Sequence, residues 1–144
     1  MKLSKKGFTL VEIMIVVAII ALLAAVAIPN LLRARLNANE GAAIGNLHTL
    51  VASMGSFQAN QSPASYPATL AELGTLVPPY IDTVLAAGVK QGYGFVYTPG
   101  AVDTRGCRND YSIVATPSIV GTTGNRIFTA DESGVIMVGG APIE

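Results

Sequence analysis

Charged residues, cysteine and histidine are all scarce in this 144-residue sequence, and Asp, Glu, Lys and Arg together make up 12% of it. The one cysteine, Cys107, cannot form an intramolecular disulfide. The one histidine, His48, cannot make a metal site alone. His48 also stands on a different expected element from Cys107, so the two are not expected to form a nucleophile and base. We therefore expect no catalytic function.

The balance of charge argues against a nucleic-acid partner. The sequence holds nine acidic and nine basic residues, and three of the basic ones are Lys2, Lys5 and Lys6. If the segment that ends at Gly7 is removed, six basic residues remain against nine carboxylates. A mildly acidic chain without a basic face is not expected to bind nucleic acid.

The longest feature of the sequence is an apolar run from Phe8 to Ile28 that contains one acidic residue, Glu12. About 20 residues at about 1.5 Å each span a hydrocarbon core of about 30 Å, so this run can cross a bilayer. Positive charge stays on the cytoplasmic side, so the lysines before Gly7 predict that the chain after Ile28 is carried outward. An ionised carboxylate at the centre of a membrane helix costs about 2.5 to 3.5 kcal/mol. We therefore expect Glu12 to have a partner.

The segment Gly7-Phe8-Thr9-Leu10-Val11-Glu12 resembles the prepilin leader shared by type IV pilins and the pseudopilins of type II secretion. The resemblance implies cleavage after Gly7 by a membrane prepilin peptidase, usually followed by N-methylation of Phe8. It further implies that Glu12 pairs with the Phe8 amine of a neighbouring subunit, so that assembly supplies the missing counter-charge. The chain is then a structural subunit of a type IV pilus or pilin-like fibre, with the major pseudopilin of a type II secretion system as the alternative.

Other interpretations of the N-terminus stay open. A secretory signal peptide accounts for the lysines, and Ala25-Val26-Ala27 offers a cleavage site. Its apolar region is typically about 7 to 15 residues and does not normally carry a glutamate. A plain anchor that tethers a periplasmic binding domain needs the membrane helix but has no use for Glu12.

The whole chain predicts an α+β fold in four parts. Residues 1–7 form the leader, 8–28 the transmembrane and assembly helix, 29–61 an amphipathic helix, and 62–144 a globular β-sheet region. Pro29 is a weak point of the long helix because proline removes a backbone hydrogen bond, and the resemblance implies that this stretch can lose helical structure in a filament.

The sheet is too small to be stable alone, so it is expected to cover one face of the helix. This is also the architecture of pilins. The apolar stripe that it covers is predicted from helical spacing as Ala43, Leu47, Leu50, Met54 and Phe57, widened by Ile44 and Val51. A short helix is expected at 68–73, and strands are expected at 93–98, 111–116, 126–130 and 134–138.

Calcium is the one ligand that the resemblance suggests, because major pseudopilins often bind it through acidic loop residues. Asp110, Asp131 and Glu132 are the candidate ligands. No EF-hand-like run is present in the sequence, and turn formation and solvation explain these residues without a bound ion. No other cofactor is expected.

The resemblance also implies partners and a location. The partners are further copies of the chain in a helical filament, a prepilin peptidase and N-methyltransferase, a cytoplasmic assembly ATPase and a polytopic platform protein. The expected location is the bacterial inner membrane, with a single pass and the C-terminal part in the periplasm. From there the chain is expected to enter an extracellular pilus or a periplasmic pseudopilus.

Overall fold

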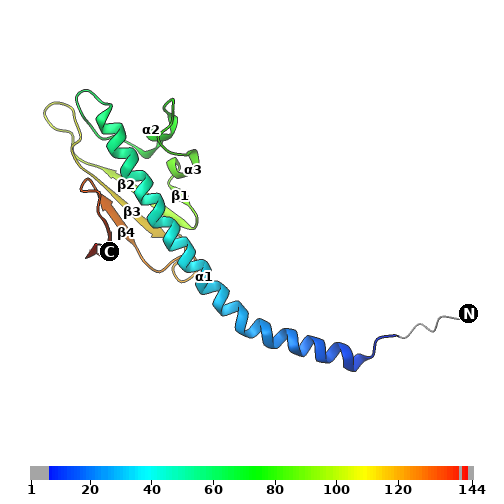
Figure 1. Ribbon diagram of the computed structural model, residues 1–144. Helices are drawn as coiled ribbons and strands as arrows, with labels where there is room; N and C mark the ends of the chain where they lie inside the picture. The colour runs from blue at the N-terminus through cyan, green and yellow to red at the C-terminus, as the bar shows by residue number, and fades with distance from the viewer. Residues whose placement is uncertain (1–6, 140, 143–144) are drawn as a thin grey trace, which may run out of the picture. The chain divides into compact units, whose positions relative to one another are not determined.

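One long helix joins the two parts of this protein. The computed structural model describes residues 7–139, 141 and 142. Helix α1 (Leu10–Ala59) is 50 residues long and includes Pro29 without a break in its helical assignment (Figure 1). The chain divides into two compact units within this helix, the first ending at Ala34 and the second beginning at Arg35. The long helix expected from the sequence is confirmed.

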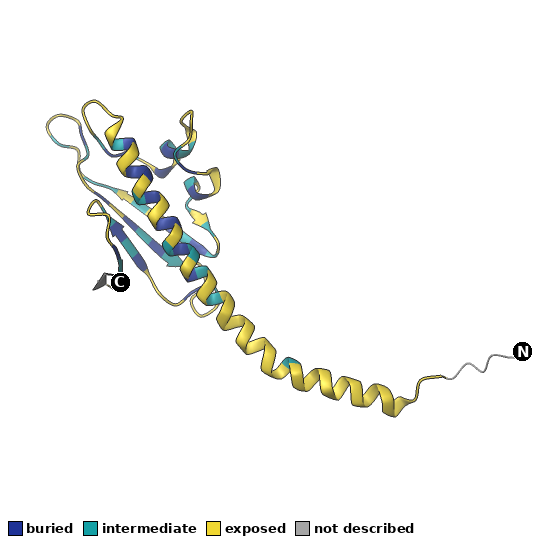
Figure 2. Cartoon of the chain, in the orientation of Figure 1, coloured by how far each residue is buried: buried dark blue, intermediate teal, exposed yellow. Residues whose placement is uncertain are grey.

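The described part of the first unit, residues 7–34, is mainly helix, and almost all of its residues are exposed. Large apolar residues from Phe8 to Leu32 are exposed, and the first half of α1 is coloured as exposed almost throughout in Figure 2. An apolar window of α1 has a mean hydropathy of 3.0 and no buried residue. This surface costs free energy in water, so it requires lipid or another protein surface.

The second unit is an antiparallel sheet with two short helices before it. The strands follow the order β1-β2-β3-β4-β5-β6, so each pairs with its neighbour in sequence. The elements after α1 are α2 (Leu70–Thr75), α3 (Thr83–Ala86), β1 (Val89–Lys90), β2 (Tyr93–Pro99), β3 (Tyr111–Pro117), β4 (Phe128–Asp131), β5 (Ile136–Val138) and β6 (Ala141–Pro142). The α+β, pilin-like fold is confirmed.

The core of the second unit lies between the later half of α1 and one face of the sheet. Every residue of the predicted stripe from Ala43 to Phe57 is buried, and Ile44 and Val51 are partly buried against the same core. The sheet supplies the other side of this core. Successive side chains of a strand point to opposite faces of the sheet, so every second residue of a strand can pack against α1. The sheet residues that pack there are Tyr93, Phe95, Tyr111, Ile113, Ala115, Phe128, Ala130 and Ile136.

Two details of the sequence prediction need correction. Three or four strands were expected, but the described residues contain six. β1 and β6 were not predicted because each is two residues long, which is too short to show a period of two. One short helix was expected after the long one, at 68–73, yet a second short helix, α3, follows. It begins because Asp82 accepts a hydrogen bond from the backbone N–H of Leu85 at 2.9 Å, as an N-cap does.

A tight turn joins β4 to β5. Gly134 has a φ of 78°, a conformation that glycine adopts without steric cost. The N–H of Gly134 donates to the carbonyl of Asp131 at 3.0 Å and closes the turn.

Candidate functional site

Glu12 has a hydrogen-bond partner within its own chain, which the sequence analysis did not anticipate. The backbone N–H and the hydroxyl of Thr9 donate to its carboxylate at 2.8 Å and 2.7 Å, and the N–H of Glu12 donates back to Thr9 Oγ1 at 3.2 Å. This is the reciprocal capping box of the pattern Thr-x-x-Glu, visible in the sequence as Thr9-Leu10-Val11-Glu12. Thr9 therefore starts α1, but it brings no positive charge to Glu12.

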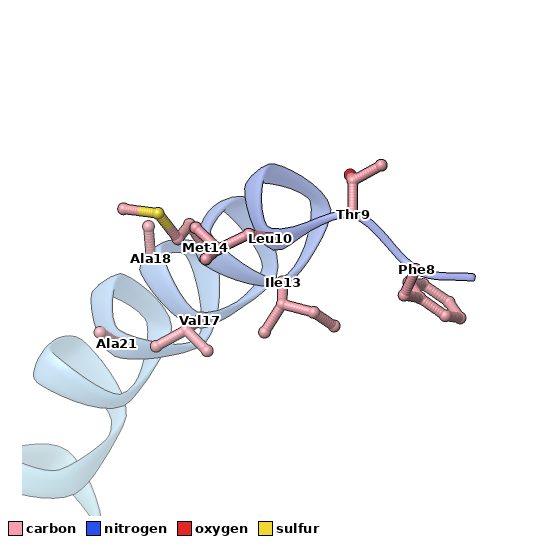
Figure 3. Close-up of a pocket in the computed structure, with 8 residues that line it drawn as sticks. All are labelled: Phe8, Thr9, Leu10, Ile13, Met14, Val17, Ala18 and Ala21. Carbon is pink, nitrogen blue, oxygen red and sulfur yellow. The ribbon is translucent and has the colours of Figure 1, made fainter.

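The first turns of α1 present an apolar surface next to this carboxylate. Figure 3 shows Ile13, Val17 and Ala21 pointing to one side of the helix, as residues four apart should. Phe8 belongs to the same surface and is 83% exposed. A depression on a lone helix is no enclosed binding site. It is a strip into which the side chains of another helix can pack.

The three acidic residues considered for calcium do not form one ligand cluster. Asp110 and Glu132 line a single surface hollow beside Tyr111. Asp131 instead accepts hydrogen bonds from the N–H and hydroxyl of Ser133 in its own turn. Among the described residues, no group of three or more His, Cys, Asp or Glu side chains is placed to hold a metal.

Cys107 and His48 are not brought together. Cys107 lies in a loop but is buried, with 2% of its surface exposed. Its loop is ordered by Asp103, which accepts hydrogen bonds from the N–H groups of Cys107 at 2.9 Å and Arg105 at 2.8 Å. The bond from Cys107 is the largest influence that holds the pKa of Asp103 below its ordinary value. His48 is exposed on α1.

An ion pair with a buried carboxylate joins α1 to the loop between β3 and β4, and sequence reasoning missed it. Glu40 is 3% exposed and accepts hydrogen bonds from the N–H groups of Asn125 at 2.8 Å and Arg126 at 3.2 Å. The guanidinium of Arg126 adds a third bond at 2.6 Å. Burial raises the pKa of Glu40, but these bonds outweigh it and leave the pKa below its ordinary value.

The signal for this pair is present in the sequence. Glu40 stands three residues before Ala43 and seven before Leu47, which places it on the apolar stripe of α1. A charged residue on a buried face needs a partner, because burying an isolated charge is costly. The partner is 86 residues away in sequence, so only the fold identifies it as Arg126.

The fold and the first turns of α1 together define a class of protein, namely a chain of pilin-like α+β architecture whose exposed apolar helix anchors it in a membrane. The family described as the prokaryotic N-terminal methylation motif matches residues 2–28. The resemblance based on the segment from Gly7 to Glu12 is confirmed by this match.

Comparison with known proteins finds two groups of relatives. It is 49% identical over 72 residues to the type IV wide pilus major component PilA4 of Thermus thermophilus, covering 49% of this chain and 55% of that protein. It is 48% identical over 52 residues to the type IV major pilin protein PilA of Myxococcus xanthus, covering 36% of this chain and 24% of that one. It is 34% identical over 77 residues to the type II secretion system core protein G of Dickeya chrysanthemi, covering 54% and 49%.

The extent of these similarities is limited. The chain spans between 24% and 55% of the length of these relatives. No solved structure matches the chain significantly. The similarity to type IV pilins and to a type II secretion pseudopilin is therefore clear, while the activity of the whole protein is a matter for proposal.

Proposed function

We propose that this chain is a structural subunit of a type IV pilin-class filament, assembled through the apolar half of α1. The observation that carries the proposal is the N-terminal methylation motif on a helix whose apolar window has no buried residue. Such a surface is stable in lipid and equally in the centre of a bundle of sister helices. The chain then acts by assembling, with no enzymatic role.

Glu12 couples the membrane state to the assembled state. Thr9 donates two hydrogen bonds to one oxygen of its carboxylate but leaves the charge uncompensated. Cleavage after Gly7 creates a positive amine on Phe8. Each charge alone in lipid is costly, and a pair formed between subunits removes both costs, so assembly is favoured over the dispersed pool.

The remaining partners and the location follow from the same proposal. A prepilin peptidase cleaves after Gly7 and methylates Phe8, and a cytoplasmic ATPase with a platform protein drives extraction from the inner membrane. The lysines of the leader hold the N-terminus in the cytoplasm, and the second unit lies in the periplasm before export. Pro29 is the place at which α1 loses helical structure on packing.

A second candidate function is the major pseudopilin of a type II secretion system. One specific observation favours it: the similarity to core protein G extends over 54% of this chain, compared with 49% and 36% for the two pilins. Identity is lower over that longer stretch. Deleting the gene separates the candidates, because loss of surface fibres supports a pilus and loss of an exported protein supports a pseudopilus.

Mass analysis of the protein isolated from membranes tests the processing step. A chain that starts at methylated Phe8 supports the proposal, while one that starts at Ile28 supports a signal peptide and rules the proposal out.

The substitution Glu12→Gln tests the assembly step. It removes the charge and keeps the size, so filaments that can be pelleted should be lost while the membrane pool and cleavage persist. The matched control is Thr9→Val, which removes the hydroxyl donor and keeps the charge, so its filaments should form. A tethered binding domain predicts that neither change affects membrane level or function. Normal filaments from the Glu12→Gln variant contradict the proposed role of this residue.

A further inference from the structure

Exposed charges of opposite sign lie at the two ends of the second unit, and one partly buried arginine, Arg108, lies two residues from the acidic residue Asp110. The described residues form three ion pairs: Lys90 with Asp82, Arg105 with Asp103, and Arg126 with Glu40. Arg35 is exposed and belongs to none of them. Asp110 and Glu132 are likewise exposed and outside these pairs.

Arg35 stands at the end of the unit where the loop after β3 meets α1. That loop is tied to the helix by Asn39, whose side-chain amide donates to the carbonyl of Thr123 at 3.0 Å, and by Glu40. Asn39 is one helical turn after Arg35. The arginine therefore lies near this end of the sheet, on an exposed stretch of α1.

Asp110 and Glu132 lie at the other end of the sheet. Pairing of Pro99 with Tyr111 and of Ser112 with Asp131 brings the ends of β2 and β4 beside the start of β3. Asp110 and Glu132 line one hollow there, called here the acidic hollow, of about 240 Å³. At about 30 Å³ per water this is roughly eight water volumes, enough for a guanidinium and part of its stem.

Gly100 keeps this hollow compact. Its N–H donates to the carbonyl of Asp110 at 3.0 Å. A Cβ at Gly100 would lie 2.6 Å from that same carbonyl and would also collide with the carboxylate. Because Gly100 has no side chain, Asp110 can lie close to the end of β2.

The same chain cannot join Arg35 to its own acidic hollow. The turn that carries Glu132 approaches α1 at Val51, because a Cβ on Gly134 would lie 3.6 Å from Val51 Cγ1. Arg35 and Val51 are 16 residues apart, which is about 24 Å along the helix axis. This distance is far beyond the reach of an arginine side chain.

We propose that Arg35 of one copy docks in the acidic hollow of a neighbouring copy, between Asp110 and Glu132. The occupant is a second copy because the complementary charges sit at opposite ends of one unit. Two different patches that pair between copies form a heterologous contact, which propagates into an open helical assembly. The inference rests on the proposed filament function and specifies one contact that holds neighbouring subunits in register.

A charge exchange tests the contact. Arg35→Glu and Glu132→Arg should each lower the yield of pelleted filaments by about tenfold, because like charges then face each other. The double variant should recover most of the wild-type yield. Both residues are exposed, so the membrane level and the unfolding midpoint of each variant should match those of the wild type.

Arg33→Glu is the matched control. Arg33 is two residues from Arg35, or about 200° around the helix, so it points away from the contact. Combining Arg33→Glu with Glu132→Arg should therefore give no rescue. If Glu132→Arg is rescued equally by Arg33→Glu and by Arg35→Glu, the effect is one of general charge and the proposal is overturned. The proposal is also overturned if the double variant of Arg35→Glu and Glu132→Arg yields fewer filaments than either single variant.

Two further outcomes are informative. If a chelator abolishes wild-type filaments and calcium restores them, while the exchanged pair gives no rescue, the acidic hollow holds a cation and the proposed contact is wrong. If Arg35→Glu forms normal filaments while Glu12→Gln forms none, this contact fails and the filament function stands.

Discussion

Removing Glu40 should destabilise the second unit more than removing its partner Arg126. The carboxylate receives two backbone N–H groups and one guanidinium, and it is 3% exposed. Bonds to a charged acceptor are worth about 1.5 to 3 kcal/mol each, and the lower value applies here because Asn125 is exposed to water. The Arg126 side chain is 56% exposed, so its contribution is discounted to about 1 kcal/mol or less.

Glu40→Ala should therefore lower the free energy of unfolding by about 3 to 4 kcal/mol. Arg126→Ala should lower it by about 1 to 2 kcal/mol, since both backbone bonds to Glu40 survive and a cation–π contact with Phe128 is lost. Glu40→Gln keeps one acceptor oxygen and should fall between the two.

The assay is urea unfolding of the full-length protein in a non-ionic detergent, followed by near-ultraviolet circular dichroism. Tyr93 and Tyr111 are buried in the second unit, so their signal reports its packing. An Arg126→Ala variant that loses as much stability as Glu40→Ala refutes the reasoning, because the guanidinium and not the backbone bonds would then dominate.

The same ion pair predicts how stability responds to acid. The pKa of Glu40 lies below its ordinary value of 4.5 in the folded protein. A lowered pKa in the folded state stabilises the protein above the unfolded pKa, and this stabilisation is lost as pH falls through the folded pKa. Wild-type stability should therefore decline below about pH 4.5, and Glu40→Gln should decline less steeply over the same interval.

Three further predictions concern packing. Gly124→Ala should destabilise the protein by about 1 to 3 kcal/mol in the same assay, because a Cβ there would lie 2.6 Å from Cζ of Tyr93. Leu47→Ala should cost about 2 to 5 kcal/mol, since this side chain is fully buried, and a loss below 1 kcal/mol would contradict the described core. Cys107 should react with maleimide only after unfolding, because it is 2% exposed, and rapid labelling of the native protein would show that its loop opens.

The parts of the fold that could be predicted from sequence are those with a regular period. The stripe from Ala43 to Phe57 repeats every three or four residues, and the strands that begin at Tyr93 and Tyr111 alternate, so both were located correctly. β1 has two residues and offers no period to detect. Its position is fixed by pairing with β2, which is information about the fold and not about the local sequence.

The candidate site shows the same division. Gly7 to Glu12 could be identified because the motif is contiguous, and its match to the methylation family depends on no distant residue. The capping box of Thr9 and Glu12 was equally local and was overlooked, since Glu12 was considered only as a charge in lipid. The acidic hollow required the pairing of three strands before Asp110 and Glu132 could be seen as neighbours.

Polar groups on α1 are treated in opposite ways in the two units. Glu40 has its positive partner within the chain, so the second unit can hold its structure before any neighbour arrives. Glu12 has hydrogen bonds from Thr9 but no cation among the described residues around it. The proposed filament function requires this asymmetry, because a complete ion pair at Glu12 within one chain would leave assembly no charge to neutralise. In the proposed filament, the charge that favours assembly therefore lies at the first turn of α1, and the stability of the second unit does not depend on it.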